Sequence, residues 1–350
     1  MSSPPSSAQS SSALAPRVRL AHAPTPLEFL PNLTARLGGP RIYVKRDDCT
    51  GLAIGGNKAR QLEYYLGQAV AEGADTILIT GAVQSNFVRQ AAAAARKCGM
   101  DCHIQLEDRV PHNDATYMGS GNVLLDQLLG ATLHEFPEGE NEAAADANLE
   151  AIADGLRAEG RKPYVIHLGI DHPPWGGLGY VDAGREIASQ AHGMNLKLDA
   201  VLVATGSGLT HAGLLAGLRA AGENVPVYGI CVRRDAKQQR ARIERRLAEI
   251  IDLAGLPADT AGAADISVDD TWLGPGYGRL TDEIRNALDI AATTEALILD
   301  PVYTGKVMAG LIGMVERGDF RPTDNLLFVH TGGSPALFGY EELNRTQAPG

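Results

Sequence analysis

Gly55-Gly56-Asn57-Lys58-Ala59-Arg60 is the stretch that decides the fold of this chain. It follows a short β-like run at residues 42–45 and opens a helical pattern. A lysine at a helix start faces unpaired backbone N–H groups, whose positive field, together with partial burial, favours the neutral amine. A neutral lysine amine can form a Schiff base with a carbonyl. From this stretch alone, an ordinary solvated lysine in the first turn of a helix explains the pattern equally well.

Three further stretches, residues 80–90, 204–213 and 300–306, lie between an apolar run and a helical pattern. Glycine and hydroxyl residues between a strand and a helix expose backbone N–H donors, which form a site for anions. One reactive lysine, one phosphate cradle and polar loops at strand ends are what pyridoxal phosphate (PLP) requires from a protein.

Six short motifs occur in a fixed order between about residue 17 and the C-terminus. They are Lys45-Arg46-Asp47-Asp48, Gly55-Gly56-Asn57-Lys58, Gln84-Ser85-Asn86, Thr205-Gly206-Ser207-Gly208, Pro301-Val302-Tyr303-Thr304-Gly305-Lys306 and His330-Thr331-Gly332-Gly333. In these motifs the chain resembles the fold-type II PLP enzymes of the D-cysteine desulfhydrase, 1-aminocyclopropane-1-carboxylate (ACC) deaminase and L-cysteate sulfo-lyase family. The resemblance implies an α/β fold of two domains, similar to tryptophan synthase β, with parallel sheets flanked by helices and the cofactor in the interdomain cleft.

The resemblance also implies catalytic roles. Lys58 would hold PLP and then move a proton at the α- or β-carbon of the substrate. Ser85 would bind the substrate carboxylate, carry a proton or act as a nucleophile, and Asn86 would bond the phenolic oxygen of PLP. Tyr303 and Tyr277 would relay protons near the substrate. As alternatives, Ser85 and Asn86 merely cap the following helix, and the tyrosines are half-buried residues at loop edges.

The remaining expected contacts divide between cofactor and substrate. The expected cofactor contacts are Asn57, Thr205, Gly206, Ser207, Gly208, Leu209, Thr210, Thr304 and Thr331 in addition to Lys58 and Asn86. The expected substrate contacts are Gln84 and Phe87 in addition to Ser85 and Asn86.

Two positions bear on the substrate. Thr304 stands where ACC deaminases carry a glutamate that keeps the pyridine nitrogen protonated. A neutral threonine makes a weaker electron sink, which favours β-elimination of a good leaving group. Phe87 stands where other members carry histidine or glutamine. Its ring either packs in the core or lines the pocket and excludes polar substituents.

We therefore expect a PLP-dependent lyase that acts on a small amino acid with a β leaving group. D-cysteine desulfhydrase ranks first, L-cysteate sulfo-lyase second and ACC deaminase third. A catalytically silent PLP-binding protein stays open because of Phe87. An NADP-binding oxidoreductase stays open because Gly206-Ser207-Gly208 partly fits a dinucleotide fingerprint and the next strand ends at Arg233-Arg234.

Composition and net charge limit the binding partners and the cellular location that we expect for this protein. The 350 residues are 44% hydrophobic, enough for a packed core, and the net charge of −11 argues against nucleic acid or anionic membrane as a partner. No apolar run reaches the length of about 18 residues that a transmembrane helix needs. Neither the four cysteines nor the nine histidines show metal-ligand spacing, so we expect reduced thiols, a cytoplasmic protein and no metal. The resemblance implies a homodimer.

Apolar runs alternate with amphipathic stretches, which predicts parallel sheets covered by helices. Besides the run at 42–45, predicted strands cover residues 76–80, 102–106, 164–168, 200–204, 225–231, 297–299 and 326–330. Predicted helices cover residues 57–72, 85–98, 116–129, 142–158, 177–192, 209–221, 235–254, 279–289 and 303–316.

Periodicity alone does not locate a domain boundary. The resemblance implies a small α/β domain of residues 59–172 and a large PLP-binding domain of residues 17–58 and 173–350. Residues 1–16 are rich in Ser, Pro and Ala and predict a disordered tail. A chloroplast transit peptide is disfavoured because it would carry arginines. The Gly- and Pro-rich segment 167–179 is expected to be a loop at the edge of the substrate site.

Overall fold

Two β-sheets form the framework of the computed structural model, which describes residues 15–110 and 114–343. The larger sheet has the strand order β1-β2-β10-β7-β8-β9. Its strands are β1 (Leu27–Phe29), β2 (Arg41–Lys45), β10 (Asn325–Val329), β7 (Ala200–Thr205), β8 (Val227–Cys231) and β9 (Ile266–Asp269). All neighbours pair in parallel except β1 and β2, which pair antiparallel.

Alternate residues of the larger sheet face two separate layers of helices. One layer consists of α1 (Pro31–Leu37), α10 (Asp282–Glu295) and α11 (Thr304–Glu316), and the other of α7 (Gly177–Gly193), α8 (Leu209–Ala220) and α9 (Ala236–Leu253). On β7, Leu202 packs in the cluster that includes α11, whereas Val201 and Val203 pack in the cluster that includes α8. Because both faces are covered, the central strands read as continuous apolar runs.

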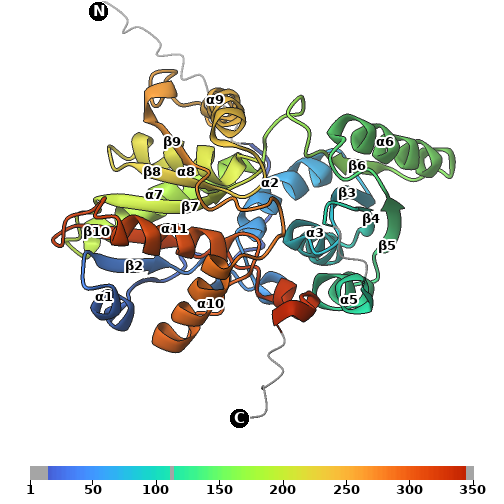
Figure 1. The fold of residues 1–350 in the computed structure, drawn as a ribbon. Helices are drawn as coiled ribbons and strands as arrows, with labels where there is room; N and C mark the ends of the chain where they lie inside the picture. The colour runs from blue at the N-terminus through green and yellow to red at the C-terminus, as the bar shows by residue number, and fades with distance from the viewer. Residues whose placement is uncertain (1–14, 111–113, 344–350) are drawn as a thin grey trace, which may run out of the picture.

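The smaller sheet contains only parallel strands, in the order β5-β4-β3-β6. They are β5 (Thr132–Phe136), β4 (Asp101–Glu107), β3 (Thr76–Ala82) and β6 (Pro163–Ile166). Helices α2 (Lys58–Ala71) and α3 (Asn86–Lys97) share one core cluster with Ile77 and Ile79, and α6 (Glu142–Ala158) packs on Leu78 from the other face. Helix α2 lies between the two sheets (Figure 1). Helix α5 (Gly121–Leu128) packs on α3, and the short helix α4 (Ala115–Gly119) packs on α5. Short 3-10 turns cover Asp47–Cys49, Leu52–Ile54, Ala263–Asp265, Ser334–Gly339 and Glu341–Leu343.

The α/β architecture with parallel sheets and flanking helices confirms the predicted fold class. Two predicted elements differ. Residues 297–299 are not a strand of either described sheet; Leu297 N instead bonds Ala291 O at the end of α10. The helix predicted over 116–129 is two helices, since Ser120 is extended between them, with a φ of −109° and a ψ of −173°.

Residues 1–14 of the expected tail over 1–16 lie outside the described residues. Pro16 itself packs its carbonyl against Gly67 of α2, where a Cβ would come within 2.1 Å of the oxygen. Within the described part of the chain, we find no helix with the length and apolar character that crossing a membrane requires.

A buried ion network holds the segment before α2 in place. Both oxygens of the Asp47 carboxylate accept hydrogen bonds from Arg60, at 2.9 and 3.0 Å, and Tyr180 donates to it at 2.6 Å. Arg60 also pairs with Glu186, which pairs with the buried Lys45. Although burial opposes its ionisation, these cations hold the pKa of Asp47 below its ordinary value. The network fixes the chain on both sides of Lys58.

Candidate active site

A cavity lies at the carboxyl ends of strands from both sheets. Segments that follow β3, β4, β6, β7, β8 and β10 all contribute to its lining. It encloses about 900 Å³ including its open mouth, a size common for small-molecule sites. Predicted site residues that line it are Asn57, Lys58, Ser85, Asn86, Phe87, Gly206, Ser207, Gly208, Thr210, Tyr277, Tyr303 and Thr331.

Two glycines allow the chain to deliver Lys58 to this cavity. Gly55 and Gly56 have φ angles of 70° and 127°, which L side chains rarely adopt. A Cβ on Gly55 would lie 1.9 Å from the carbonyl oxygen of Asp48. Lys58 is the first residue of α2, so its own backbone N–H is among the groups of that helix that lack an intrahelical acceptor.

The Lys58 amine is poorly solvated. Its Nζ lies 4.8 Å from the centroid of the Phe87 ring and donates to Gln61 Oε1 at 3.2 Å. Burial lowers the pKa of Lys58 to about 8. Phe87 is only 5% exposed and also contacts the Tyr65 ring, so it packs in the core and lines the cavity at once.

The loop after β7 forms an anion cradle opposite the lysine. Gly208 begins α8 with a φ of 96°, and this helix has no side-chain cap from the described residues. Its first N–H groups are therefore available to an anion. Thr210 Oγ1 accepts from Asn57 and Gln61 of the lysine segment, each at 2.9 Å, so the cradle and the lysine are bonded together.

Ser85 and Asn86 begin α3 beside the lysine. Ser85 Oγ accepts from the backbone N–H groups of Phe87 and Val88, at 3.2 and 3.5 Å, so it caps α3 while lining the cavity. The side-chain oxygen of Asn86 accepts from Asn122 at 3.1 Å and from Arg89 as well, which fixes its orientation. Capping of α3 by Ser85 is therefore compatible with its position in the cavity wall.

Two tyrosines meet across the cavity wall. The hydroxyl groups of Tyr277 and Tyr303 lie 2.5 Å apart, and burial raises the pKa of each. Arg109, which follows β4, also lines the cavity and pairs with Glu107 at 2.7 Å. Sequence reasoning missed Arg109, because a single arginine after a strand carries no recognisable spacing.

Three arginines beside the phosphate loop were also not assigned to the site from the sequence. Arg234 donates to Gly206 O at 3.2 Å, and Arg242 donates to Ser207 O at 2.9 Å. Together with Arg233 they surround Glu142 at the start of α6. Burial raises the pKa of Glu142, but the arginines outweigh it and hold the pKa below its ordinary value. Glu140 also pairs with Arg233, so two carboxylates face three guanidinium groups and this wall keeps a net positive charge.

Four residues predicted to contact ligand lie outside the lining formed by the described residues: Gln84, Thr205, Leu209 and Thr304. Gln84 donates to the carbonyl oxygens of Tyr117 and Ser120. The Thr304 hydroxyl donates to Asp300 Oδ1 at 2.6 Å and accepts from Asp300 N at 2.7 Å. Thr304 therefore fixes the turn that carries Tyr303.

A desolvated lysine, a helix N-terminus and a cationic wall at the carboxyl ends of parallel strands define a site for a carbonyl cofactor that bears a phosphate. Comparison with known proteins agrees with that class. Residues 18–332 match the family described as pyridoxal-phosphate dependent enzyme. The chain belongs to this family.

Among characterised relatives, the D-cysteine desulfhydrase of Salmonella newport is 42% identical over 325 residues, covering 93% of this chain and 96% of the relative. The ACC deaminase of Methylobacterium nodulans is 40% identical over 326 residues with the same coverage. A crystal structure of an ACC deaminase homologue superimposes with a TM-score of 0.82 at 37% identity, covering 93% of this chain and 94% of that one. The O-ureido-L-serine synthase structure, at 16% identity and a TM-score of 0.68, shares the fold. These matches confirm a fold-type II PLP enzyme.

Proposed function

We propose that this chain is a D-cysteine desulfhydrase, a PLP-dependent lyase that converts D-cysteine and water to pyruvate, ammonia and hydrogen sulfide. The observation that carries the proposal is the meeting of the desolvated Lys58 amine, the Ser85 cap and the Tyr277–Tyr303 pair in one cavity. The two named relatives at 40–42% identity support a lyase or deaminase acting on a small amino acid.

The residues of the cavity fit PLP. Its phosphate suits the uncapped start of α8 and the flanking Gly206–Gly208 loop, beside which Arg234 and Arg242 add positive charge. Lys58 would hold the cofactor's aldehyde carbon, and Asn86 would bond its ring hydroxyl. When bound, PLP supplies an electron sink for the pair released when a Cα–H bond breaks. Thr331 would add one more contact.

The chain's own residues account for the proton movements. A neutral Lys58 amine can take the proton from the substrate's α-carbon. The Ser85 hydroxyl and the backbone N–H of Asn86, the first residue of α3, can bind the substrate carboxylate. The Tyr277–Tyr303 hydroxyl pair can donate a proton to the departing sulfur, because burial keeps both phenols protonated.

A substrate screen tests the proposal. D-cysteine, L-cysteine, L-cysteate, D-serine and ACC are each incubated with the holoenzyme, and keto acid, ammonia and sulfide are measured. We expect the highest kcat/KM for D-cysteine, with pyruvate and sulfide released in equal amounts. A preference for ACC would assign the deaminase reaction instead. If none of the five compounds releases a keto acid, the protein binds PLP but does not catalyse elimination or deamination of these substrates.

Replacing Phe87 with histidine is expected to raise kcat/KM for L-cysteate relative to D-cysteine by about 10-fold. The phenyl ring cannot bond a sulfonate, and one regained hydrogen bond is worth about 1.4 kcal/mol, which is one decade in rate. Phe87→Leu is the matched control, because it removes the ring without adding a donor. Initial rates with both substrates and a melting curve are measured for each variant. If both variants have a lower melting temperature and keep the wild-type substrate ranking, the Phe87 ring contributes to core packing and does not select the substrate.

The pH dependence of cofactor attachment reports the Lys58 pKa. Attachment of PLP to the apoprotein, followed by its visible absorption, is expected to be half-maximal near pH 8, where half of the amine is neutral, and to level off above about pH 9. An ordinary lysine, with a pKa of about 10.4, would keep accelerating beyond pH 9. Nα-acetyl-lysine in the same assay provides the control, since the titration of PLP itself affects both reactions. A protein profile that follows the free lysine would contradict the desolvated amine.

Three broader assignments remain part of the proposal. The separation of β3–β6 from the strands of the larger sheet supports a small domain of residues 59–172 and a large domain of residues 17–58 and 173–350. Family resemblance supports a homodimer. Four cysteines without metal-ligand spacing, expected as reduced thiols, support a cytoplasmic location.

A further inference from the structure

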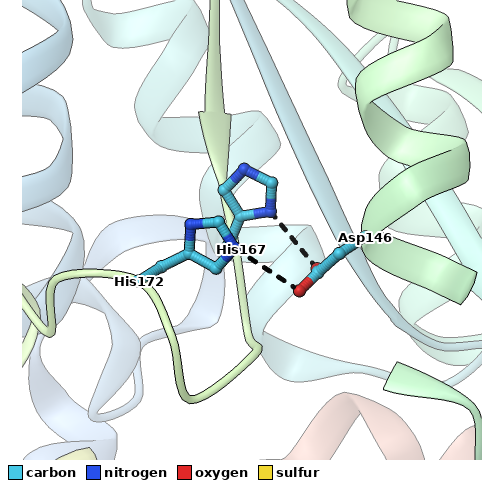
Figure 2. Close-up of side chains that lie close together, drawn as sticks. All are labelled: Asp146, His167 and His172. Atoms are coloured by element: carbon cyan, nitrogen blue, oxygen red, sulfur yellow. Dashed lines mark ion pairs between the residues drawn. The ribbon is translucent and has the colours of Figure 1, made fainter. Parts of the chain in front are cut away.

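Two histidines and an aspartate that the sequence separates come together beside the cavity wall. His167 follows β6, His172 lies in the loop after it, and Asp146 is on α6. One nitrogen from each ring and one carboxylate oxygen all lie within 4.8 Å of one another. Figure 2 shows both rings facing the Asp146 carboxylate. The spacing along the chain matches no common metal motif, so the sequence predicted no metal here.

Both rings present a nitrogen to Asp146 at ion-pair distance, and the nitrogen of His167 makes no regular hydrogen bond to a described residue. His167 Nδ1 lies 3.3 Å from Asp146 Oδ1, and His172 Nε2 lies 3.7 Å from Oδ2. The two rings stack with centroids 3.6 Å apart and planes 9° apart. His167 has a side chain only 9% exposed, and its Nδ1 makes no hydrogen bond to any described residue. A buried ring nitrogen without a hydrogen bond needs an explanation, and an absent ion is one.

The other nitrogen of His167 is held in the manner of a metal ligand. Glu150, one turn after Asp146 on α6, lies 2.9 Å from His167 Nε2. A carboxylate on the far nitrogen of a histidine fixes its tautomer and aims the near nitrogen at the metal. Gly169 makes room for the carboxylate, because a Cβ there would lie 2.3 Å from Asp146 Oδ2.

We propose that Asp146, His167 and His172 bind a divalent transition-metal ion, with Zn²⁺ as the best match. Imidazole and carboxylate ligands suit Zn²⁺, and three protein ligands leave one position for water. Ligand atoms around a tetrahedral Zn²⁺ lie about 3.3–3.5 Å apart. The His167–Asp146 pair already has that separation, and His172, 38% exposed on a loop, has room to turn its ring inward.

The position of the ion gives it a structural role beside the active site. None of its three ligands lines the cavity formed by the described residues, so the ion is separate from the cofactor site. Leu168, next to His167, does line that cavity and accepts a hydrogen bond from Arg242. A bound ion would therefore join α6 to the loop that forms one side of the cavity wall.

Metal binding to the PLP-loaded protein tests the proposal. A Cys49→Ser background removes the exposed thiol, which could itself bind Zn²⁺. After chelation and dialysis, Zn²⁺ is titrated by calorimetry, and bound metal is counted by elemental analysis. We expect one Zn²⁺ per chain, a dissociation constant in the micromolar range or below, and a higher melting temperature with Zn²⁺ present.

Single variants localise the ion. His172→Ala is expected to weaken Zn²⁺ binding by about 10-fold or more. Changes to residues that only orient a metal ligand already lower the affinity for the metal by about 10- to 100-fold. The side chain of His172 is partly exposed, so the fold should survive its removal, and circular dichroism checks this. His192→Ala, at an exposed site on α7, is the matched control and should leave binding unchanged. No binding by the Cys49→Ser protein tighter than about 100 µM, or equal binding by His172→Ala and its parent, would overturn the proposal.

Discussion

Replacing Lys58 with alanine is expected to lower kcat/KM for D-cysteine by roughly 10³-fold or more, because the variant loses both the covalent anchor and the proton-transfer base. Stability should change little, since the amine makes one hydrogen bond to the described residues, at 3.2 Å to Gln61. Steady-state rates with added PLP, together with a melting curve, measure both effects.

Lys97→Ala is the control for this variant, because Lys97 is exposed at the end of α3 and away from the cavity lining. It should retain wild-type kcat/KM. Turnover by Lys58→Ala within 10-fold of wild type, with the fold intact, would contradict the assignment of Lys58 as the reactive lysine.

Replacing Asp47 with alanine is expected to lower the free energy of unfolding by about 3–5 kcal/mol, the cost of breaking a buried ion pair from one side. Among the described residues, the change leaves the buried Arg60 with Glu186 as its one ion-pair partner, and it removes the acceptor of the Tyr180 hydroxyl. The side-chain bonds of Asp47 hold its backbone in place, and its backbone carbonyl accepts from Gly56 N. Loss of the side-chain bonds should therefore loosen the segment that carries Lys58. Urea unfolding at neutral pH measures the effect.

The neighbouring residue provides a matched control. Asp48 pairs with Arg46, whose side chain is 25% exposed, so Asp48→Ala should cost about 1 kcal/mol or less. Equal losses for the two variants would show that the buried network does not set the stability of this region.

Central and edge strands differed in how well the sequence predicted them. The central strands, such as β3 and β7, are buried on both faces and appear as continuous apolar runs. The three missed strands, β1, β5 and β9, all lie at sheet edges. These three strands are partly exposed and mix polar with apolar residues, so no apolar run marks them. The fourth edge strand, β6, was predicted from the apolar run at 164–168. The false strand at 297–299 is an apolar run whose buried leucines pack in the core, although it pairs with no described strand.

The site shows a similar division. The cavity location of motif residues such as Lys58 and Ser85 was predictable because it depends on local backbone geometry, which a short stretch of sequence encodes. Glu142 and Arg242 were not, because they meet at the cavity only after α6 and α9 pack near each other. His167 and Asp146 come together for the same reason. Contacts of this kind depend on tertiary packing and leave no spacing signal in one sequence.

The most direct test of the central claim is to locate the cofactor's attachment point. Borohydride reduction of the holoenzyme, followed by proteolysis and mass spectrometry, should place the pyridoxyl label on Lys58. Two other buried lysines are available for comparison: Lys45 is paired with Glu186, and Lys306 donates to the carbonyl oxygens of Leu273 and Gly276. Label on Lys45 or Lys306, or no label on Lys58, would contradict the assignment of Lys58 as the lysine that binds PLP.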